Sequence, residues 1–433
     1  MVDRNHPTDR IHIPQTRRSS VSDHRSGARP SAVAMTVGLT LLALNLRPAV
    51  GSVSPLLDDI QESVGLSDSA VSVLTTLPVV CLGVFAAVSP ALSRRLGTPR
   101  ALVLGFLFLI AGILVRLDEA AWALFLGTAL AGAGLAIGNV LMPAVIKSVF
   151  PDRVRLYTGI GTAVLSAGAA LAAGVAVPLR NATDSWSGSL ALWVVPAALG
   201  LIVWLPLARR SERPAPAAGS TARGSLLGDA MAWQVTGYLA LRALAYFTAL
   251  GWLPTILADL GHSNAASGAL LSVAMLVSVP GALFAPILVG RKGTAPMVVA
   301  IAVGGAISLL GLLWVPGIAA LWVVILGVTL GAGHAMALTF IGLRSPNPQV
   351  AAQLSGMVQT IGYLVGGIAG PLLLGLLHGA TDGWTVSLVL LAAFTLPELI
   401  LGLCSGRGRA VRPRFRQTSA TPQQTTTPPV LVD

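Results

Sequence analysis

The sequence predicts an all-α membrane protein in which twelve transmembrane helices form two similar six-helix halves. Hydrophobic residues make up 54% of the 433 residues and charged residues only 10%, whereas soluble proteins carry about 25% charged residues. Apolar stretches of about 20 residues, long enough to cross a bilayer as a helix, recur along most of the chain. Internal repeats, described below, divide these stretches into two sets.

Each expected span is an apolar stretch bounded by polar or charged residues. Glycine (47 residues) and proline (28 residues) are frequent inside the stretches, which membrane helices tolerate better than soluble helices do. The expected spans are 32–54, 68–90, 98–117, 121–146, 155–179, 188–208, 231–257, 265–289, 295–315, 319–343, 351–377 and 385–404.

The net charge of +11 is explained by membrane topology and not by nucleic-acid binding. If the N-terminus is cytoplasmic, all 28 basic residues except Arg47, Arg116, Arg180 and Arg242 fall on the cytoplasmic side. Such an excess of Lys and Arg sets orientation by the positive-inside rule. We therefore expect a multi-pass membrane protein with both termini in the cytoplasm.

Three stretches of the first half recur roughly 200 residues later, which indicates a parallel duplication. The expected division is a disordered N-terminal tail (1–31), a first half (32–208), a cytoplasmic linker (209–228), a second half (229–404) and a disordered C-terminal tail (405–433). The recurring stretches are "ATDSWSGSL" (182–190) and "ATDGWTVSL" (380–388), "PALSRRLGT" (90–98) and "PILVGRKGT" (286–294), and "WALFLGTAL" (122–130) and "WVVILGVTL" (322–330).

Arg47 lies inside the apolar run "LTLLALNLRPAVG" (39–51). A central arginine costs about 2.5–3.5 kcal/mol on translocon scales, so an ionisable group at this depth is a candidate functional residue. Two structural interpretations compete with that one. The side chain could reach the outer interface, or it could bond a carbonyl that the kink at Pro48 exposes.

The sequence resembles the major facilitator superfamily, whose two halves rock around a site at their interface. Within it, the motifs resemble the cyanate/nitroimidazole transporter family (CynX/NimT-like). That resemblance implies a transporter of the bacterial inner membrane that moves small polar or anionic solutes or nitroimidazole-like compounds. Arg47, Asn139 and Lys147 lie on its motifs. The motifs are "NLRPAVGSVSPLL" (45–57), "GNVLMPAVIKSVFP" (138–151), "WLPTIL" (252–257), "LSGMVQTIGYLVGGIAGPLLLG" (354–375) and "TDGW" (381–384).

A second arginine, Arg242, occupies nearly the same position of the repeat as Arg47. The first and seventh helices line the central cavity in this superfamily, so we expect the two guanidinium groups to face each other across it. Two such groups would repel unless an anion or a strongly polar planar solute lay between them. The alternative is that Arg242 contacts the backbone of a neighbouring helix.

Few other polar residues lie at depth. Asn45, Asn139, Gln359 and Tyr363 are further candidates for solute binding, each with interhelical contact as the alternative. His334 is the candidate for proton coupling, because its charge changes near neutral pH. Glu398 is the carboxylate placed inside a span, towards the inner end of the twelfth helix. That helix is peripheral in the superfamily, so we do not expect Glu398 to carry the proton.

The combined hypothesis is a monomeric secondary transporter that moves a small polar or anionic, cyanate-like solute by alternating access. The alternative is efflux of nitroimidazole-like or other drug-like heteroaromatic compounds. The expected partners are the solute, the lipid bilayer and a coupling proton. We expect no nucleic acid, no cofactor and no metal site, because no catalytic, nucleotide-binding or metal-ligand motif is recognised, and hence no enzyme activity.

Overall fold

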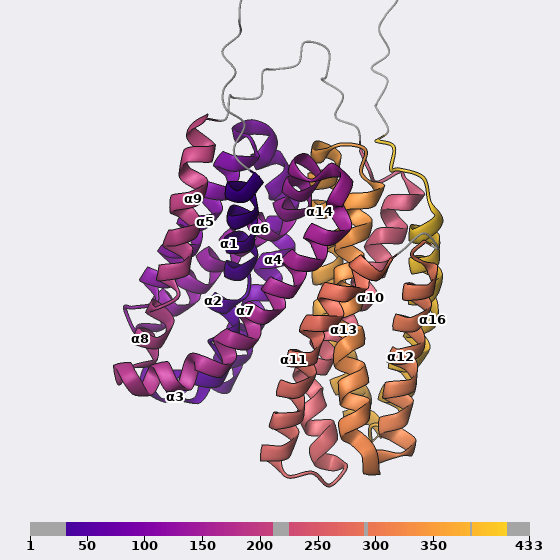
Figure 1. Ribbon diagram of the computed structural model, residues 1–433. Coiled ribbons are helices and arrows are strands. Elements are labelled where there is room, and N and C mark those ends of the chain that lie inside the picture. The colour runs from indigo at the N-terminus through magenta and orange to yellow at the C-terminus, as the bar shows by residue number, and fades with distance from the viewer. Residues whose placement is uncertain (1–31, 211–224, 290–292, 382, 414–433) are drawn as a thin grey trace, which may run out of the picture.

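The computed structural model describes residues 32–210, 225–289, 293–381 and 383–413, and these form two helical bundles side by side (Figure 1). The expected tail 1–31, most of the expected linker and residues 414–433 lie outside the described part. Twelve helical segments are long and apolar enough to cross a membrane, as the sequence predicts. We call the two bundles the N half and the C half.

The N half, drawn from indigo to magenta in Figure 1, ends at Arg210. Its elements are α1 (Ala32–Asn45), α2 (Pro48–Gly51), η1 (Ser54–Leu56), α3 (Leu57–Val64), α4 (Asp68–Leu96), α5 (Thr98–Val115), α6 (Ala121–Val149), η2 (Pro151–Arg153), α7 (Val154–Thr183), α8 (Trp186–Ala191) and α9 (Val194–Arg210).

The C half runs to the yellow helix α16. Its elements are α10 (Ala230–Asp259), α11 (Asn264–Leu288), α12 (Ala295–Trp314), η3 (Pro316–Ile318), α13 (Ala319–Arg344), α14 (Pro348–Ile361), η4 (Gly362–Gly366), α15 (Gly367–Thr381) and α16 (Thr385–Arg407).

The backbone repeats the duplication seen in the sequence. Helices α4 and α11 begin alike, because the hydroxyl groups of Ser67 and Ser263 accept the backbone N–H groups of Ala70 and Ala266. Turns with positive φ, which glycine adopts without strain, fall before and after each of these helices. The glycines there are Gly65 (φ 70°) and Gly97 (84°) in the N half, and Gly261 (94°) and Gly293 (81°) in the C half.

Several described spans are not single regular helices, and two of them, the first and the eleventh, are interrupted part-way along their length. The first is interrupted between α1 and α2, where Pro48 begins a new short helix, and α3 lies at its end. The eleventh contains the wide π-helical turn η4 between α14 and α15. Breaks of this kind in transporters present backbone groups and side chains to a central site, so both breaks are relevant to the functional site.

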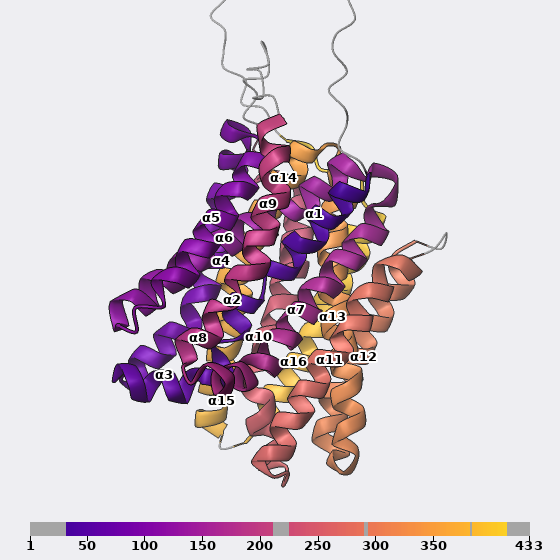
Figure 2. The same cartoon turned by 60° about the vertical axis from the view of Figure 1, so that its left-hand side comes forward.

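The first and last described helices share one end of the molecule. Helix α1 begins and α16 ends at the upper end in Figure 1, which we call the terminal end; α3 and α8 lie towards the opposite, far end. The two halves lie together near the terminal end and diverge below it, and Figure 2 shows the same bundles after a 60° turn.

Close contacts between the halves come from the terminal-end parts of their helices. Arg155, at the start of α7, donates to the carbonyl of Val289, just after α11, at 3.0 Å. Gly159 of α7 packs so closely on α11 that an added Cβ would lie 2.6 Å from the Leu283 carbonyl oxygen. At this end, the halves are therefore held together by the close packing of α7 on α11 and by the part-buried hydrogen bond of Arg155.

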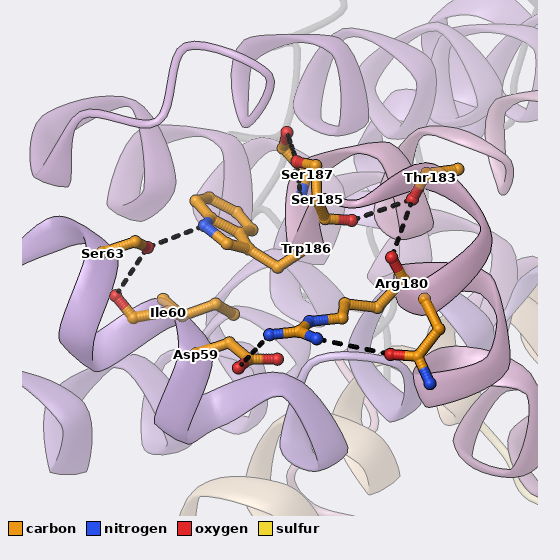
Figure 3. A network of polar contacts seen from close by, with 9 residues as sticks. Asp59, Ile60, Ser63, Arg180, Thr183, Ser185, Trp186 and Ser187 are labelled. Atoms are coloured by element: carbon orange, nitrogen blue, oxygen red, sulfur yellow. Dashed lines mark hydrogen bonds and ion pairs between the residues drawn. The ribbon is translucent and has the colours of Figure 1, made fainter.

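A polar network fixes the far end of the N half (Figure 3). Arg180 of α7 forms an ion pair with Asp59 of α3 at 2.9 Å, and the Trp186 indole of α8 donates to the Ser63 hydroxyl of α3 at 2.7 Å. Helix α3 is thereby attached to the turn between α7 and α8. This network stabilises the segment that follows the break in the first span.

The chain near the C-terminus differs from the expectation of a tail that begins at 405. Helix α16 continues to Arg407, and Val411 is buried, with only 1% of its surface exposed. The Arg344 guanidinium donates to the carbonyls of Ser405 and Gly406, and the backbone N–H of Arg412 donates to Asp229. Residues 405–413 are therefore held against α13 and the start of α10, a set of contacts that hydropathy does not reveal.

Candidate functional site

Arg47 emerges at the break in the first span. Pro48 has no N–H to continue helix α1, so the chain turns and α2 starts directly after Arg47. The fourteen residues of α1 separate Arg47 from the terminal end of the span, which is roughly 20 Å at 1.5 Å per residue. The guanidinium therefore lies deep within the length of the span, and its side chain is half-buried.

The Arg47 side chain reaches the other half of the protein. Its Cζ atom lies 5.5 Å from the ring centroid of Tyr246 on α10, a cation–π distance. Arg47 is half-buried, and its Nε atom is buried without a hydrogen-bond partner among the described residues. Among the described residues, no carboxylate forms an ion pair with this guanidinium. It is a cation with unused donors at the interface between the halves.

Three aromatic rings continue from this contact. The rings of Tyr246 and Phe247 meet edge to face at 5.3 Å, and Phe247 meets Tyr363 at 6.2 Å. Tyr363 lies in the π-helical turn η4, so the break in the eleventh span places its ring beside α10. An arginine from one half thus faces a row of aromatic rings from the other half.

Asn139 and Gln359 connect the halves by a hydrogen bond. The Gln359 amide on α14 donates to the backbone carbonyl of Asn139 on α6 at 3.1 Å and to the hydroxyl of Ser355 at 2.8 Å. The Asn139 amide nitrogen is buried and lacks a partner in the residues that the structure describes. Gln359 therefore makes an interhelical contact, while Asn139 keeps a free donor.

Asn45 lies away from these groups. Its amide donates to the carbonyl of Leu41 in its own helix at 2.8 Å and to that of Pro196 on α9 at 2.9 Å. Both bonds stay inside the N half. The side chain thus provides the interhelical contact that was the structural alternative, and it anchors α1 just before the break.

Arg242 does not present an unbalanced charge to Arg47, as the sequence suggested it would. Its Nη1 atom lies 3.4 Å from the Glu398 carboxylate of α16 and donates to the carbonyl of Thr329 on α13 at 3.2 Å. Only 4% of Arg242 and 3% of Glu398 is exposed. The expectation failed because Glu398 faces the interior of the C half, although its helix was expected to be peripheral.

A third ionisable residue of this region is His334. It interacts with both Arg47 and Arg242, and it follows Gly333, whose missing side chain leaves room for the Arg242 guanidinium. Its Nε2 atom is buried and has no hydrogen-bond partner within the described ranges. The imidazole is therefore buried and is influenced by the positive charges of Arg47 and Arg242.

Sequence reasoning missed several residues of this region. The sequence analysis assigned no role to Tyr246 or Phe247, although Tyr246 lies one helical turn after Arg242. Arg116 was expected at the outer side, yet it is buried with 1% exposed and donates to the Ala49 carbonyl of α2 at 2.8 Å. It thereby supports the short helix that follows Arg47. Among the described residues, no three His, Cys, Asp or Glu side chains come together as a metal site would require.

Comparison with known proteins agrees with this architecture. A family model for the Major Facilitator Superfamily matches residues 35–371. The 2-nitroimidazole transporter of Escherichia coli (strain K12) is 35% identical over 387 residues, which cover 88% of this chain and 97% of that protein. The cyanate transport protein CynX of the same organism is 30% identical over 337 residues, covering 77% and 88%. The E. coli fucose:proton symporter structure has a TM-score of 0.71 at 14% identity, covering 88% of this chain and all of that one.

Twelve apolar spans in two repeated halves, with polar groups at their shared centre, define a multi-pass membrane transporter of small solutes and not an enzyme. The chain belongs to the Major Facilitator Superfamily. The resemblance to the cyanate/nitroimidazole transporter family, inferred from the motifs, is confirmed by the two relatives.

Proposed function

We propose that this protein moves a small planar solute, either heteroaromatic or anionic, between its two halves by alternating access, and that Arg47 is the charge that binds the solute. The observation that carries the proposal is the Arg47 guanidinium, half-buried deep within the first span without a carboxylate partner and 5.5 Å from the Tyr246 ring. A buried cation that the protein itself leaves unneutralised is suited to a ligand with an electron-rich edge.

The aromatic row favours a planar solute over a round one. A flat ring can stack on Tyr246 or Phe247 while its acceptor atoms meet the guanidinium fork. Nitroimidazole-like compounds have both features, and a relative at 35% identity is a 2-nitroimidazole transporter. This heteroaromatic class is the solute that the aromatic rings favour.

A cyanate-like anion is the second candidate, and the unpaired Arg47 donor supports it. A linear anion of this size needs the cation but not the aromatic row. CynX, at 30% identity, is a cyanate transport protein. The two candidates therefore predict different consequences for the loss of an aromatic ring.

The orientation that we propose has the terminal end in the cytoplasm of a bacterium. Basic side chains gather in the last turns of helices that end there, as the positive-inside rule requires. The contacts of Arg155 and Gly159 close that end, so solute would approach from the far side in this arrangement. We further propose that one chain acts alone, with 32–208 and 229–404 as its moving halves.

Transport assays in proteoliposomes test the proposal. Wild-type protein is expected to exchange 2-nitroimidazole across the vesicle membrane, and Arg47→Ala to abolish the exchange; radiolabelled cyanate is assayed in parallel. Arg180→Ala is the matched control, because that arginine belongs to the far-end network and its side chain is 43% exposed. Exchange of neither compound by the wild type, or normal exchange by Arg47→Ala, would contradict the proposal.

Tyr246→Leu separates the two solute classes. Removal of the ring should weaken 2-nitroimidazole binding by about tenfold, the equivalent of ~1.4 kcal/mol of stacking and cation–π contact. Cyanate transport should be nearly unchanged by the same substitution. The opposite pattern would assign the site to small anions and remove the heteroaromatic class.

A further inference from the structure

The ion pair between Arg242 and Glu398 is an incomplete one. The closest approach is 3.4 Å, longer than a charge-assisted hydrogen bond, and Glu398 Oε1 is buried without a hydrogen-bond partner in the part of the chain that the structure describes. The guanidinium also divides its donors, because Nη1 bonds the Thr329 carbonyl. A carboxylate that is buried in this way keeps its negative charge only through one loose contact.

The pair borders a small cavity of about 30 Å³ inside the C half, room for about two water molecules. The cavity is lined mainly by apolar side chains, with Arg242, Glu398, Thr248 and Thr395 as the polar ones. Its lining continues to the far-end parts of three helices: Ile256 of α10, Leu312 of α12 and Leu388 of α16. The pair thus borders a space that lies inside one half and extends towards the far end, separate from the Arg47 contact.

Few other ionisable groups face Glu398. Helix α10 contributes Arg242 and Tyr238, whose ring packs on Gly402, one turn after Glu398, and whose hydroxyl is buried without a described partner. Helix α12 contains no ionisable residue, and α15 contains only His378, near its far end. Helix α13 contributes the Thr329 carbonyl and, further along, His334. Among the described residues, Arg242 is therefore the charged side chain that faces the buried Glu398 carboxylate.

We propose that Glu398 is the proton-binding group of this transporter and that a proton competes with Arg242 for its carboxylate. A proton that arrives through the cavity adds to a carboxylate oxygen and gives a neutral carboxyl group. The ion pair is then lost, and the guanidinium keeps its positive charge and its bond to the Thr329 carbonyl. Release of the proton restores the pair, so the balance is one proton bound and one released per cycle.

Arg242 and helix α13 link Glu398 to the proposed solute site at Arg47. Arg242 packs against Gly333, and His334, the next residue, interacts with both Arg242 and Arg47. A change in the position of the Arg242 side chain would therefore be felt by α13 and by the charge at the solute site. This proposal differs from the sequence-based expectation, which assigned the proton to His334.

The first test requires no solute. Infrared difference spectra of the purified full-length protein, recorded as the pH is lowered, should show the C=O stretching band of a carboxyl group that becomes protonated. We expect Glu398→Gln to lack this band, Glu398→Asp to shift it, and the exposed control Glu119→Gln to keep it. Identical spectra for the wild type and Glu398→Gln would overturn the proposal.

The second test rests on the proposed function and uses 2-nitroimidazole as the probe in proteoliposomes. With one proton per solute, a pH difference of one unit supports accumulation of about tenfold. Glu398→Gln should lose this response and keep exchange of the solute at equal pH, where no net proton movement is needed. A purely structural role would reduce exchange as well, and that result would overturn the proposal.

The two tests fail separately. If the wild type does not move 2-nitroimidazole, the proposed solute class is contradicted, and the infrared titration still decides whether Glu398 binds the proton. If Glu398→Gln proves unstable, Arg242→Gln/Glu398→Gln removes both charges and keeps similar side-chain volumes. That double variant should also exchange the solute without a response to the pH difference; a normal response would overturn the proposal.

Discussion

The two halves place an arginine at nearly the same position of their repeat, yet the two arginines have different surroundings. Arg47 in the N half follows a helix break and contacts the Tyr246 ring of the opposite half. Arg242 in the C half lies inside the continuous helix α10, buried against Glu398 and the Thr329 carbonyl. One cation is available at the interface, and the other is neutralised within its own half.

Under the two proposals, this difference divides two tasks between the halves of a duplicated chain. A cation that stays unpaired costs free energy, which a bound solute with acceptor atoms recovers. A cation paired with a carboxylate costs less, and its partner can exchange that pairing for a proton. The break at Pro48 separates the two cases, because α10 has no proline at the corresponding place and its chain stays helical there.

The largest expected effect concerns stability. Arg242→Ala leaves the buried Glu398 carboxylate without its counter-charge and should lower the free energy of unfolding by about 3–5 kcal/mol. Arg47→Ala removes no ion pair and should lower it by less than about 1 kcal/mol. Thermal unfolding of the purified variants in detergent measures both. Equal losses of unfolding free energy would show that the two arginines contribute equally to stability, which would contradict this account.

A second expected effect compares helix packing in the halves. In the N half, a Cβ added to Gly112 of α5 would lie 2.5 Å from the Gly127 carbonyl oxygen of α6. In the corresponding pair α12 and α13, a Cβ on Gly304 would lie 2.9 Å from the methyl group of Thr329 and 3.6 Å from Cγ2 of Ile325, both side-chain atoms. Gly112→Ala should therefore destabilise by about 1–3 kcal/mol and Gly304→Ala by less than about 1 kcal/mol. The same unfolding assay gives the answer, and a reversed order would contradict the packing.

A third expected effect compares two tryptophans at equivalent positions of the far end. Trp384 donates its indole N–H to the Asp259 carboxylate at 2.6 Å, whereas Trp186 donates to the neutral Ser63 hydroxyl at 2.7 Å. Substitution by phenylalanine should cost about 1.5–3 kcal/mol at Trp384 and about 0.5–1.5 kcal/mol at Trp186. Unfolding midpoints that shift equally would show that the carboxylate adds nothing to the bond.

The fold could be predicted from the sequence because hydropathy, charge asymmetry and repeats are local patterns. The position of Arg47 at the centre followed in the same way, since the cost of a buried arginine is visible in one dimension. The partner of Arg242 could not be found, because it depends on which side of α16 faces α10. Tyr246 was missed for a similar reason: a tyrosine inside a span contacts lipid, a helix or a solute according to a rotation that hydropathy leaves open.

Binding of 2-nitroimidazole to matched arginine variants tests the central claim most directly. The dissociation constant should rise by roughly tenfold or more in Arg47→Ala, as expected for loss of a charged hydrogen bond. It should stay within about threefold of the wild-type value in Arg242→Met/Glu398→Met, which replaces the pair by apolar side chains. Calorimetric titration of the purified proteins gives both numbers. Unchanged binding by Arg47→Ala together with lost binding by the double variant would contradict the division of roles between the two halves.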